Sequence, residues 1–473
     1  SDEVANKMES AIQQAKQLQK QAEDLSKKLV DKKEVGWQEK QQLQQLLDQQ
    51  QLLQKQVEEL KRQNEINNVQ QEQFMELDPN LIEKQRQLDE LFNTVLPDEI
   101  KALYEEMQKL IDKVDKDKMN EMLDKMKNDN KTLEKSLDRN LELFKQLAFE
   151  KKLEETIDKL DKLAEEQNEL AKQAENGIDE DLKQKQEDLN KQFEELQRQL
   201  DELEKDNNDL EEPNNLPDTD QQQQEISDEM QKSSNSLNQG NKKNASNSQK
   251  SASQKMNALK QSLMDFQNEM QQQNDGEDIE SLRKILDNLI KISFDQEELM
   301  TRVNATNTVS PKYIELIQDQ KKLKDNMSLI EDSLYSVAKR QPNIQQFVFR
   351  EIEIINQNID GAIEALNNRG TSVARSKQQF AMTSMNNLAL MVAEALKETE
   401  KNSSQNSGSC SKPGGSSPKG SNSSKMKSMR DLQESLNKQM QQLKEQMDKP
   451  GGMPNGGKGG MSEQLARMAA EQE

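Results

Sequence analysis

The sequence predicts an all-α protein made of elongated coiled coils or helical hairpins, with a helical bundle and disordered polar linkers. Only 31% of the 473 residues are hydrophobic and 33% are charged, whereas globular domains contain about 45–50% apolar and about 25% charged residues. The chain has just 16 glycines and 10 prolines, so long uninterrupted helices are allowed. It is rich in Gln, Lys, Glu, Leu and Met, which are good helix formers. Full disorder is the competing interpretation.

Residues 1–97 are predicted to form a coiled coil or a helical hairpin. From Val4 to Leu29, and again after Gly36, apolar residues alternate at spacings of four and three, which is the seam of a coiled coil. The polar residues Gln50 and Asn64 occupy seam positions, where they cost stability and can fix the register. The break at Gly36 is compatible with an antiparallel hairpin or with a soft spot in one long helix.

Residues 98–212 are predicted to form long coiled-coil helices, because this stretch contains no proline. A stop signal at Asn176 and Gly177 divides it into two helices. In the first helix the apolar stripe changes phase near Phe149. The second helix keeps a stricter stripe, with Asn207 at a seam position.

Residues 213–252 are rich in Asn, Gln, Ser and Asp, and this composition predicts a disordered polar linker. Residues 253–398 carry wider, more aliphatic stripes, which are typical of packed bundle helices. Within this range Arg369 provides a basic last turn and Gly370 lies just beyond it, so we expect a helix to end there. The bundle is the best candidate for a rigid interaction domain.

The last part of the chain predicts a Ser/Gly linker over 399–424, then an amphipathic helix, a Gly-rich linker and a truncated helix over 425–473. The chain starts at Ser1 without an initiator Met, and a helical pattern is still running at Glu473. We therefore expect both ends to be edges of a larger protein, with any anchor outside this chain. The longest apolar run within it, 388–393, is too short to span a membrane.

The residue inventory predicts no catalytic, cofactor-binding or metal site. There is no histidine, so imidazole-based triads and metal sites are impossible. Cys410 is the only cysteine and stands in a Ser/Gly-rich stretch, so we interpret it as incidental. With a net charge of −22 the chain repels phosphate backbones, and nucleic-acid binding is not expected. The one basic run is scattered: Lys412, Lys419, Lys425, Lys427 and Arg430.

Four local patterns have more ordinary explanations than chemistry. Residues 452–459 nearly match a phosphate-binding loop, but Gly459 replaces the magnesium-binding hydroxyl, so a flexible linker is favoured. Residues 115–119 resemble the start of a calcium loop without its glycine, which favours a solvated helix face. The only tryptophan, Trp37, is expected to pack at a hinge. The 22 methionines are expected to fill seams and bundles rather than form a binding surface. No small-molecule substrate and no enzymatic activity are predicted.

Several stretches are more specific than heptads. They are LDRNLELFKQL (137–147), SLRKILDNL (281–289), FDQE (294–297), MTSMNNLAL (382–390) and SEQLARMAAEQE (462–473). They resemble a family of large, membrane-anchored coiled-coil proteins of the Bacteroidota cell envelope, a domain of unknown function. The likeness is scattered from about residue 100 onward. It implies a periplasmic helical region, anchored to the inner membrane by a segment that precedes Ser1, and it implies no catalytic residue.

The function expected from these patterns is that of a non-enzymatic periplasmic scaffold or tether that binds other envelope proteins. Helices with two apolar positions in seven cannot hide them alone, so the seams must pair within the chain, with another copy or with a partner protein. The alternative is an adaptor subunit of a multiprotein secretion or assembly machine, ordered by its partners. The oligomeric state, the pairing of the seams and the identity of the partner stay open at this point.

Overall fold

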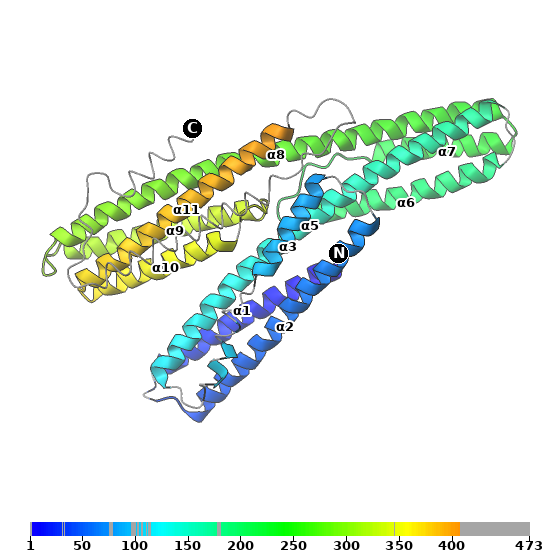
Figure 1. Cartoon of the computed structure of the whole chain (residues 1–473). Helices are drawn as coiled ribbons and strands as arrows, with labels where there is room; N and C mark the ends of the chain where they lie inside the picture. The colour runs from blue at the N-terminus through cyan, green and yellow to red at the C-terminus, as the bar shows by residue number, and fades with distance from the viewer. Residues whose placement is uncertain are drawn as a thin grey trace. The chain divides into compact units, whose positions relative to one another are not determined.

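The computed structural model describes residues 2–30, 32, 34–74, 79–95, 101, 104–105, 107–109, 111, 115–176, 181–344 and 346–406. This part of the chain consists of helices and their connections, with no strand, which confirms the all-α class (Figure 1). It divides into two compact units, Ser1–Asn274 and Asp275–Glu473. The helices are α1 (Asp2–Val30), α2 (Trp37–Phe74), α3 (Pro79–Thr94), α5 (Lys116–Glu175), α6 (Leu182–Asn208), α7 (Asp220–Asn238), α8 (Lys242–Ala305), α9 (Tyr313–Ala338), α10 (Gln346–Asn367) and α11 (Thr371–Asn406).

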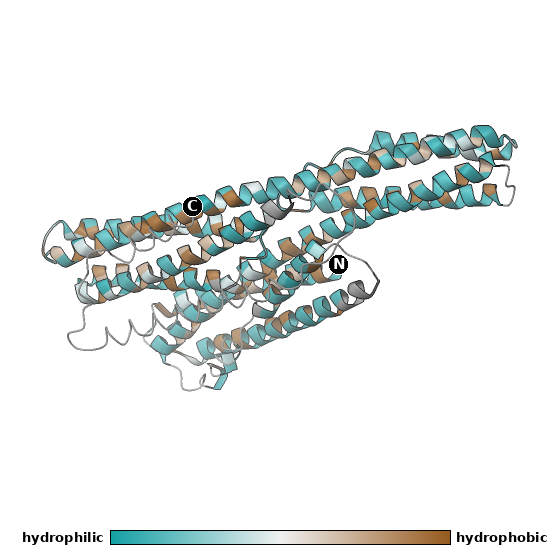
Figure 2. Cartoon of the chain, turned by 45° about the horizontal axis from the view of Figure 1, so that its top comes forward, coloured by the Kyte–Doolittle hydropathy of each residue, from teal (hydrophilic) through white to brown (hydrophobic). Residues whose placement is uncertain are grey.

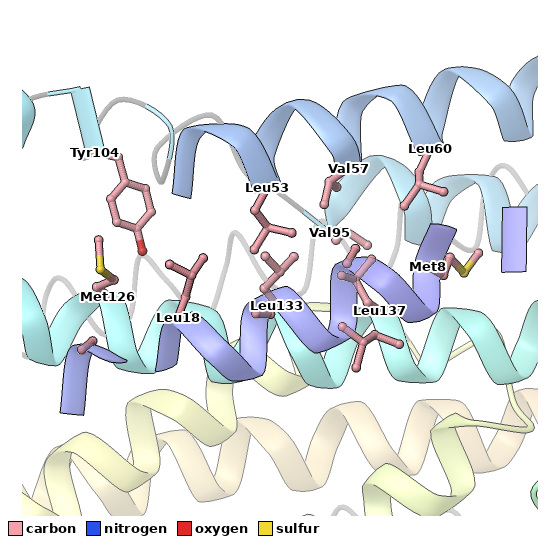
Figure 3. Packing of buried hydrophobic residues seen from close by; sticks show 14 of the residues in the cluster. Met8, Leu18, Leu53, Val57, Leu60, Val95, Tyr104, Met126, Leu133 and Leu137 are labelled. Atoms are coloured by element: carbon pink, nitrogen blue, oxygen red, sulfur yellow. The ribbon is translucent and has the colours of Figure 1, made fainter. Parts of the chain in front are cut away.

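The first core of unit 1 lies between α1, α2, α3 and the first half of α5. Figure 3 shows Leu18 of α1, Leu53 of α2 and Leu133 of α5 pointing into this core. The α1 seam also contributes three fully buried alanines, Ala11, Ala15 and Ala22. Because the distance between packed helices depends on the side chains at the contact, these small residues let the backbones of α1 and α5 approach closely.

The break at Gly36 makes an antiparallel hairpin of α1 and α2. The Lys7 Nζ donates to Gln63 Oε1 at 2.9 Å, so the start of α1 lies beside the end of α2. Gly36 precedes the first turn of α2, and its N–H donates to the Glu39 carboxylate at 2.9 Å. A Glu at the third helical position that accepts from the capping residue is half of a capping box. Of the two interpretations of this break, the hairpin is the one the structure adopts.

Helix α5 serves two cores in succession. At 60 residues it is about 90 Å long, from the α-helical rise of 1.5 Å per residue. Leu147 is the last α5 residue in the first core and Phe149 is the first in the second core. The phase change that the sequence shows near Phe149 is therefore the point where the buried face of α5 turns from one set of partners to the next. The helix ends at Asn176, as predicted, and residues 177–180 lie outside the described part.

The second core of unit 1 shows that the prediction of a disordered linker over 213–252 was wrong. Residues 220–238 form α7 and residues from 242 onward belong to α8. The buried side of α7 keeps the spacing of a seam, but polar residues share it: Gln223, Ile226, Met230, Ser233 and Leu237. Composition hid this pattern, because α6 and α8 supply the hydrogen bonds and apolar contacts that make a polar seam stable.

A defined turn joins α7 to α8. Gly240 has a φ of +73°, in the left-handed region that suits glycine. The N–H of Asn241 donates to the Ser236 carbonyl at 2.8 Å, which is the outer bond of a Schellman motif. The carbonyls at the end of α7 are thereby satisfied, and the chain reverses into α8.

Unit 2 is a four-helix bundle of the second part of α8 with α9, α10 and α11. The predicted bundle began at 253, but residues 253–274 belong to unit 1, because their apolar face packs in its second core. Gly361 of α10 lies so close to α11 that an added Cβ would be 3.3 Å from carbons of the Lys377 side chain. Residues 399–406, predicted as the start of a Ser/Gly linker, are the last two turns of α11. The predicted segments 407–424 and 425–473 lie outside the described residues.

Hydropathy follows the packing in each unit. Figure 2 shows hydrophobic residues recurring between hydrophilic ones along each helix, and the buried hydrophobic residues form the three cores. None of the described helices has a stretch of sufficient length and apolar character to cross a bilayer.

Candidate functional sites

A layer of buried amides and a hydroxyl crosses the second core of unit 1. It contains one side chain from each of its four helices: Gln167 of α5, Gln186 of α6, Ser233 of α7 and Gln249 of α8. The Gln186 Oε1 accepts from Gln167 Nε2 at 2.9 Å, from Ser233 Oγ at 2.8 Å and from Gln249 Nε2 at 2.9 Å. All four side chains are fully buried. A polar layer of this kind is satisfied only when the four helices are in one register.

Unit 2 contains a second glutamine layer. Gln296 of α8 and Gln320 of α9 exchange two hydrogen bonds, and Gln378 of α11 donates to Gln320 Oε1 at 2.8 Å. The three side chains are fully buried. Amide groups do not titrate near neutral pH, so these layers are suited to fixing the alignment of helices and not to moving protons.

Two carboxyl groups in the described part of unit 2 are buried, Asp278 and Glu351, and the first of them holds two helices together. Asp278 of α8 accepts from the Arg340 guanidinium at 2.9 Å and from Gln341 Nε2 at 2.7 Å. Burial raises the pKa of Asp278, and the bonds from Gln341 and Arg340 oppose that rise. Because Arg340 and Gln341 directly follow α9, this pair holds the end of α9 against α8.

Charged and amide groups also join α3 to α5 in unit 1. The Lys84 Nζ donates to the buried Glu150 carboxylate at 2.6 Å, and the Lys151 Nζ donates to Gln85 Oε1. Elsewhere in unit 1, burial and the neighbouring Asp129 carboxylate raise the pKa of the Tyr104 hydroxyl well above its usual range. The Tyr104 hydroxyl donates to Asp129 Oδ2 at 3.1 Å. These contacts fix helices in place.

The prediction that Trp37 packs at a hinge was wrong. Trp37 is the first residue of α2 and is 75% exposed, and Val30 at the end of α1 is 69% exposed. The hairpin is closed by the capping contact of Gly36 and Glu39, which uses no aromatic side chain.

The acidic pattern at residues 115–119 forms a helix start. The Asp115 side chain accepts from the Lys118 N–H at 2.9 Å and caps α5. Within the described part of the chain no group of three or more His, Cys, Asp or Glu residues could hold a metal ion. Cys410, the basic run 412–430 and the loop 452–459 lie outside the described residues.

Several methionines are buried in the cores, among them Met8, Met119, Met256, Met327 and Met385.

The polar seam residues that the sequence indicates make hydrogen bonds. Gln50 accepts from Asn130 Nδ2 at 2.8 Å, and Asn64 donates to Asp89 at 2.6 Å. Asn207 donates to the Asn214 carbonyl at 2.8 Å and so shapes the turn after α6.

Sequence reasoning missed the two glutamine layers, although one signal was present. Gln186 stands four residues after Leu182 and three before Leu189, so it occupies a seam position in the strictest stripe of the chain. The partners Ser233 and Gln249 had no such signal, because they stand in the segment whose composition predicted disorder.

The polar contacts described above align helices with one another. Comparison of the chain with protein-family models, curated proteins and solved structures finds no significant match.

Proposed function

We propose that this chain is a non-enzymatic coiled-coil scaffold or tether of the periplasm, which holds other envelope proteins at a set distance. One observation supports this proposal above the others: the apolar seams of the described helices pair with one another inside the chain. A helix bundle that satisfies its own seams keeps its length without a partner, which is what a spacer requires. The periplasmic location, and an anchor that precedes the chain, rest on the family resemblance.

The spacer role depends on the rigidity of α5, and a distance measurement tests it. Lys125 and Glu165 are both exposed on α5, and 40 residues of straight helix separate them by about 60 Å. Cysteines at these two positions, in a Cys410→Ser background, take spin labels for pulsed dipolar spectroscopy. The expected result is a narrow distribution near that distance. A broad or much shorter distribution would show that α5 does not act as a spacer.

The partner role is tested in native membranes. A tag inside the Ser/Gly-rich residues 407–424 allows crosslinking and affinity purification from the organism that makes the protein. Recovery of one discrete, near-stoichiometric set of envelope proteins would favour the adaptor alternative, and recovery of only the protein itself would favour a free-standing or self-associating rod.

The adaptor alternative predicts a different behaviour of the purified chain. An adaptor that is ordered by its partners has a largely coil-like circular dichroism spectrum when alone, whereas a self-contained scaffold is strongly helical at every protein concentration.

A further inference from the structure

The end of unit 2 where α8 turns into α9 and α10 turns into α11 has an unusual surface. We call it the basic end, and define it as residues 299–314 and 365–377. Figure 1 shows the two turns at the same end of the bundle. Two hydrogen bonds join them: the Arg369 guanidinium donates to the Thr308 carbonyl at 2.5 Å, and the Arg375 guanidinium donates to Asn304 Oδ1 at 2.8 Å.

Within these bounds the basic end contains no acidic residue, and two exposed carboxylates, Glu315 and Glu364, lie directly beside them. Asp and Glu make up 88 of the 473 residues, yet none occurs in residues 299–314 or in residues 365–393. The basic end itself has five cations: Arg302, Lys312, Arg369, Arg375 and Lys377. Arg302 is paired with Asp319, which lies further along α9. Arg375 also has partners, among them Asn304, and Lys312, Arg369 and Lys377 add further positive charge at this end of a chain whose net charge is −22.

Three aliphatic side chains stand out among these cations. Val309, in the α8–α9 turn, is 77% exposed, Ile314 in the first turn of α9 is 60% exposed, and Val373 in the first turn of α11 is 57% exposed. Burying an exposed aliphatic side chain is favourable, because it removes apolar surface from water. Short Ser, Thr and Asn residues and the cations Lys312, Arg369 and Arg375 are their neighbours in the sequence, so each aliphatic side chain stands close to a positive charge.

The backbone at Arg369 is strained. Its φ is +59°, in the left-handed region, and the next residue, Gly370, donates its N–H to the Ala365 carbonyl at 2.8 Å. Arg369 thus holds the position just after the helix at which glycine adopts the left-handed conformation most easily. The sequence predicts glycine at this place, but the structure puts Gly370 one residue later and an arginine in the strained conformation. Strain that glycine would relieve, retained at an exposed arginine, points to a use for that side chain.

From this geometry we infer that the basic end is a docking surface for an anionic lipid bilayer. Cations attract anionic headgroups, and exposed aliphatic side chains between them enter the boundary of headgroups and acyl chains. A bilayer needs no matching groove, which suits an end formed by two convex turns. The adjacent carboxylates of Glu315 and Glu364 offset part of this charge and leave the cations in excess, and acidic groups further from the surface than about 8–10 Å are screened at physiological salt.

Vesicle co-sedimentation of the full chain tests the inference. The probes are vesicles of phosphatidylcholine alone and vesicles in which about a third of it is replaced by phosphatidylglycerol, a fraction high enough to give a strongly negative surface. The chain is expected to bind the anionic vesicles, less so as salt is raised, and to leave the neutral vesicles unbound.

Two variants separate charge from folding. Arg369→Gly removes a cation and relieves the backbone strain, but it also removes the hydrogen bond to the Thr308 carbonyl, so its effect is compared with that of a variant at a second position. Lys312→Ala removes a second exposed cation. Each is expected to lower the partition coefficient about fivefold, equivalent to ~1 kcal/mol per cation near an anionic surface. The matched control is Lys284→Ala, which removes an exposed cation from the middle of the α8 part of unit 2 and is expected to leave binding unchanged.

A second pair of variants tests the contribution of the aliphatic side chains to vesicle binding. The double variant Val309→Ser/Val373→Ser is expected to weaken binding, whereas Leu329→Ser, which removes a 66% exposed aliphatic side chain from the middle of α9, is not. In a Trp37→Phe background, which removes the only tryptophan, Val309→Trp places a reporter in the turn. Its emission should shift to shorter wavelength when anionic vesicles are added.

Several results would overturn the inference. They are an absence of binding to anionic vesicles, equal loss in the basic-end variants and their controls, and an unshifted emission of the tryptophan at position 309. A last experiment sediments the chain without vesicles, to detect self-association. If the chain self-associates and Arg369→Gly abolishes this, the basic end binds an acidic protein surface and the lipid assignment is wrong. All these outcomes leave the spacer test on α5 unaffected.

Discussion

The substitution Gln186→Met tests whether the glutamine layer of unit 1 holds four helices in register. Methionine keeps the length and flexibility of glutamine and removes both polar atoms. Three donors then lose their acceptor: Gln167 Nε2, the Ser233 hydroxyl and Gln249 Nε2. A buried donor left without a partner costs about 1–3 kcal/mol.

The lower figure applies here, because a serine hydroxyl can rotate to a carbonyl of its own helix and glutamine side chains can turn. We therefore expect a loss of about 3 kcal/mol in the free energy of opening of the second core. Since the chain has two units, global unfolding need not be a single transition, and a local measurement is preferable. Hydrogen exchange of the intact chain provides it: exchange in peptides of α6 and α8 should become about a hundredfold faster.

Two further variants sharpen this test. Gln184→Met changes an exposed glutamine of the same helix and should alter exchange by less than about 0.5 kcal/mol. The triple variant Gln167→Leu/Gln186→Leu/Gln249→Leu replaces the amides of the layer with apolar groups, and most of the lost free energy should return. If Gln186→Met accelerates exchange no more than Gln184→Met does, the glutamine layer does not hold the helices in register.

Two other outcomes follow from buried side chains in the two units. Ala15→Leu should destabilise the first core of unit 1 by about 1–3 kcal/mol, since it adds volume at a fully buried position of the α1 seam. The exposed Gln17→Leu should be nearly neutral. Urea denaturation compares the two variants, and equal effects would show that the alanine seam is not tightly packed. For Asp278, burial raises the pKa above its ordinary value of 3.8, so its contribution to stability is complete below pH 3.8 and is lost as pH rises through the folded-state pKa. The free energy of opening of unit 2, measured relative to Asp278→Asn, should therefore fall with rising pH and then level off, and a difference that stays constant with pH would contradict this.

The heptad pattern predicted most helices of unit 1 and their breaks. The stripe of Val4 to Leu29, the interruption at Gly36 and the stop at Asn176 all mark real features of α1, α2 and α5. These predictions succeed because a seam residue is apolar whichever helix covers it, so its spacing reveals the buried face. The phase change near Phe149 carried further information, since it marks the exchange of partners along α5.

The polar segment 213–252 shows where that reasoning ends. Its seam contains Gln223 and Ser233, which no composition rule distinguishes from the side chains of a disordered linker. They are stable in a core only because Gln186 and the apolar residues of α6 and α8 surround them. A hydrogen bond between residues 47 positions apart, as between Ser233 and Gln186, leaves no trace in local spacing.

By itself, then, the sequence determined that the chain is helical, where α1 and α2 are separated, where α5 ends and α6 follows, and which face of these helices is apolar. Those properties depend on local propensity and on the 3.6-residue period, which act over one or two turns. Only the tertiary structure decided that Gly36 makes a hairpin, that the boundary between units lies at residue 274 and that Trp37 faces solvent. It also assembled the two glutamine layers and the basic end, because each requires side chains from different helices, and their meeting is decided by packing and by turn geometry rather than by neighbours in the chain.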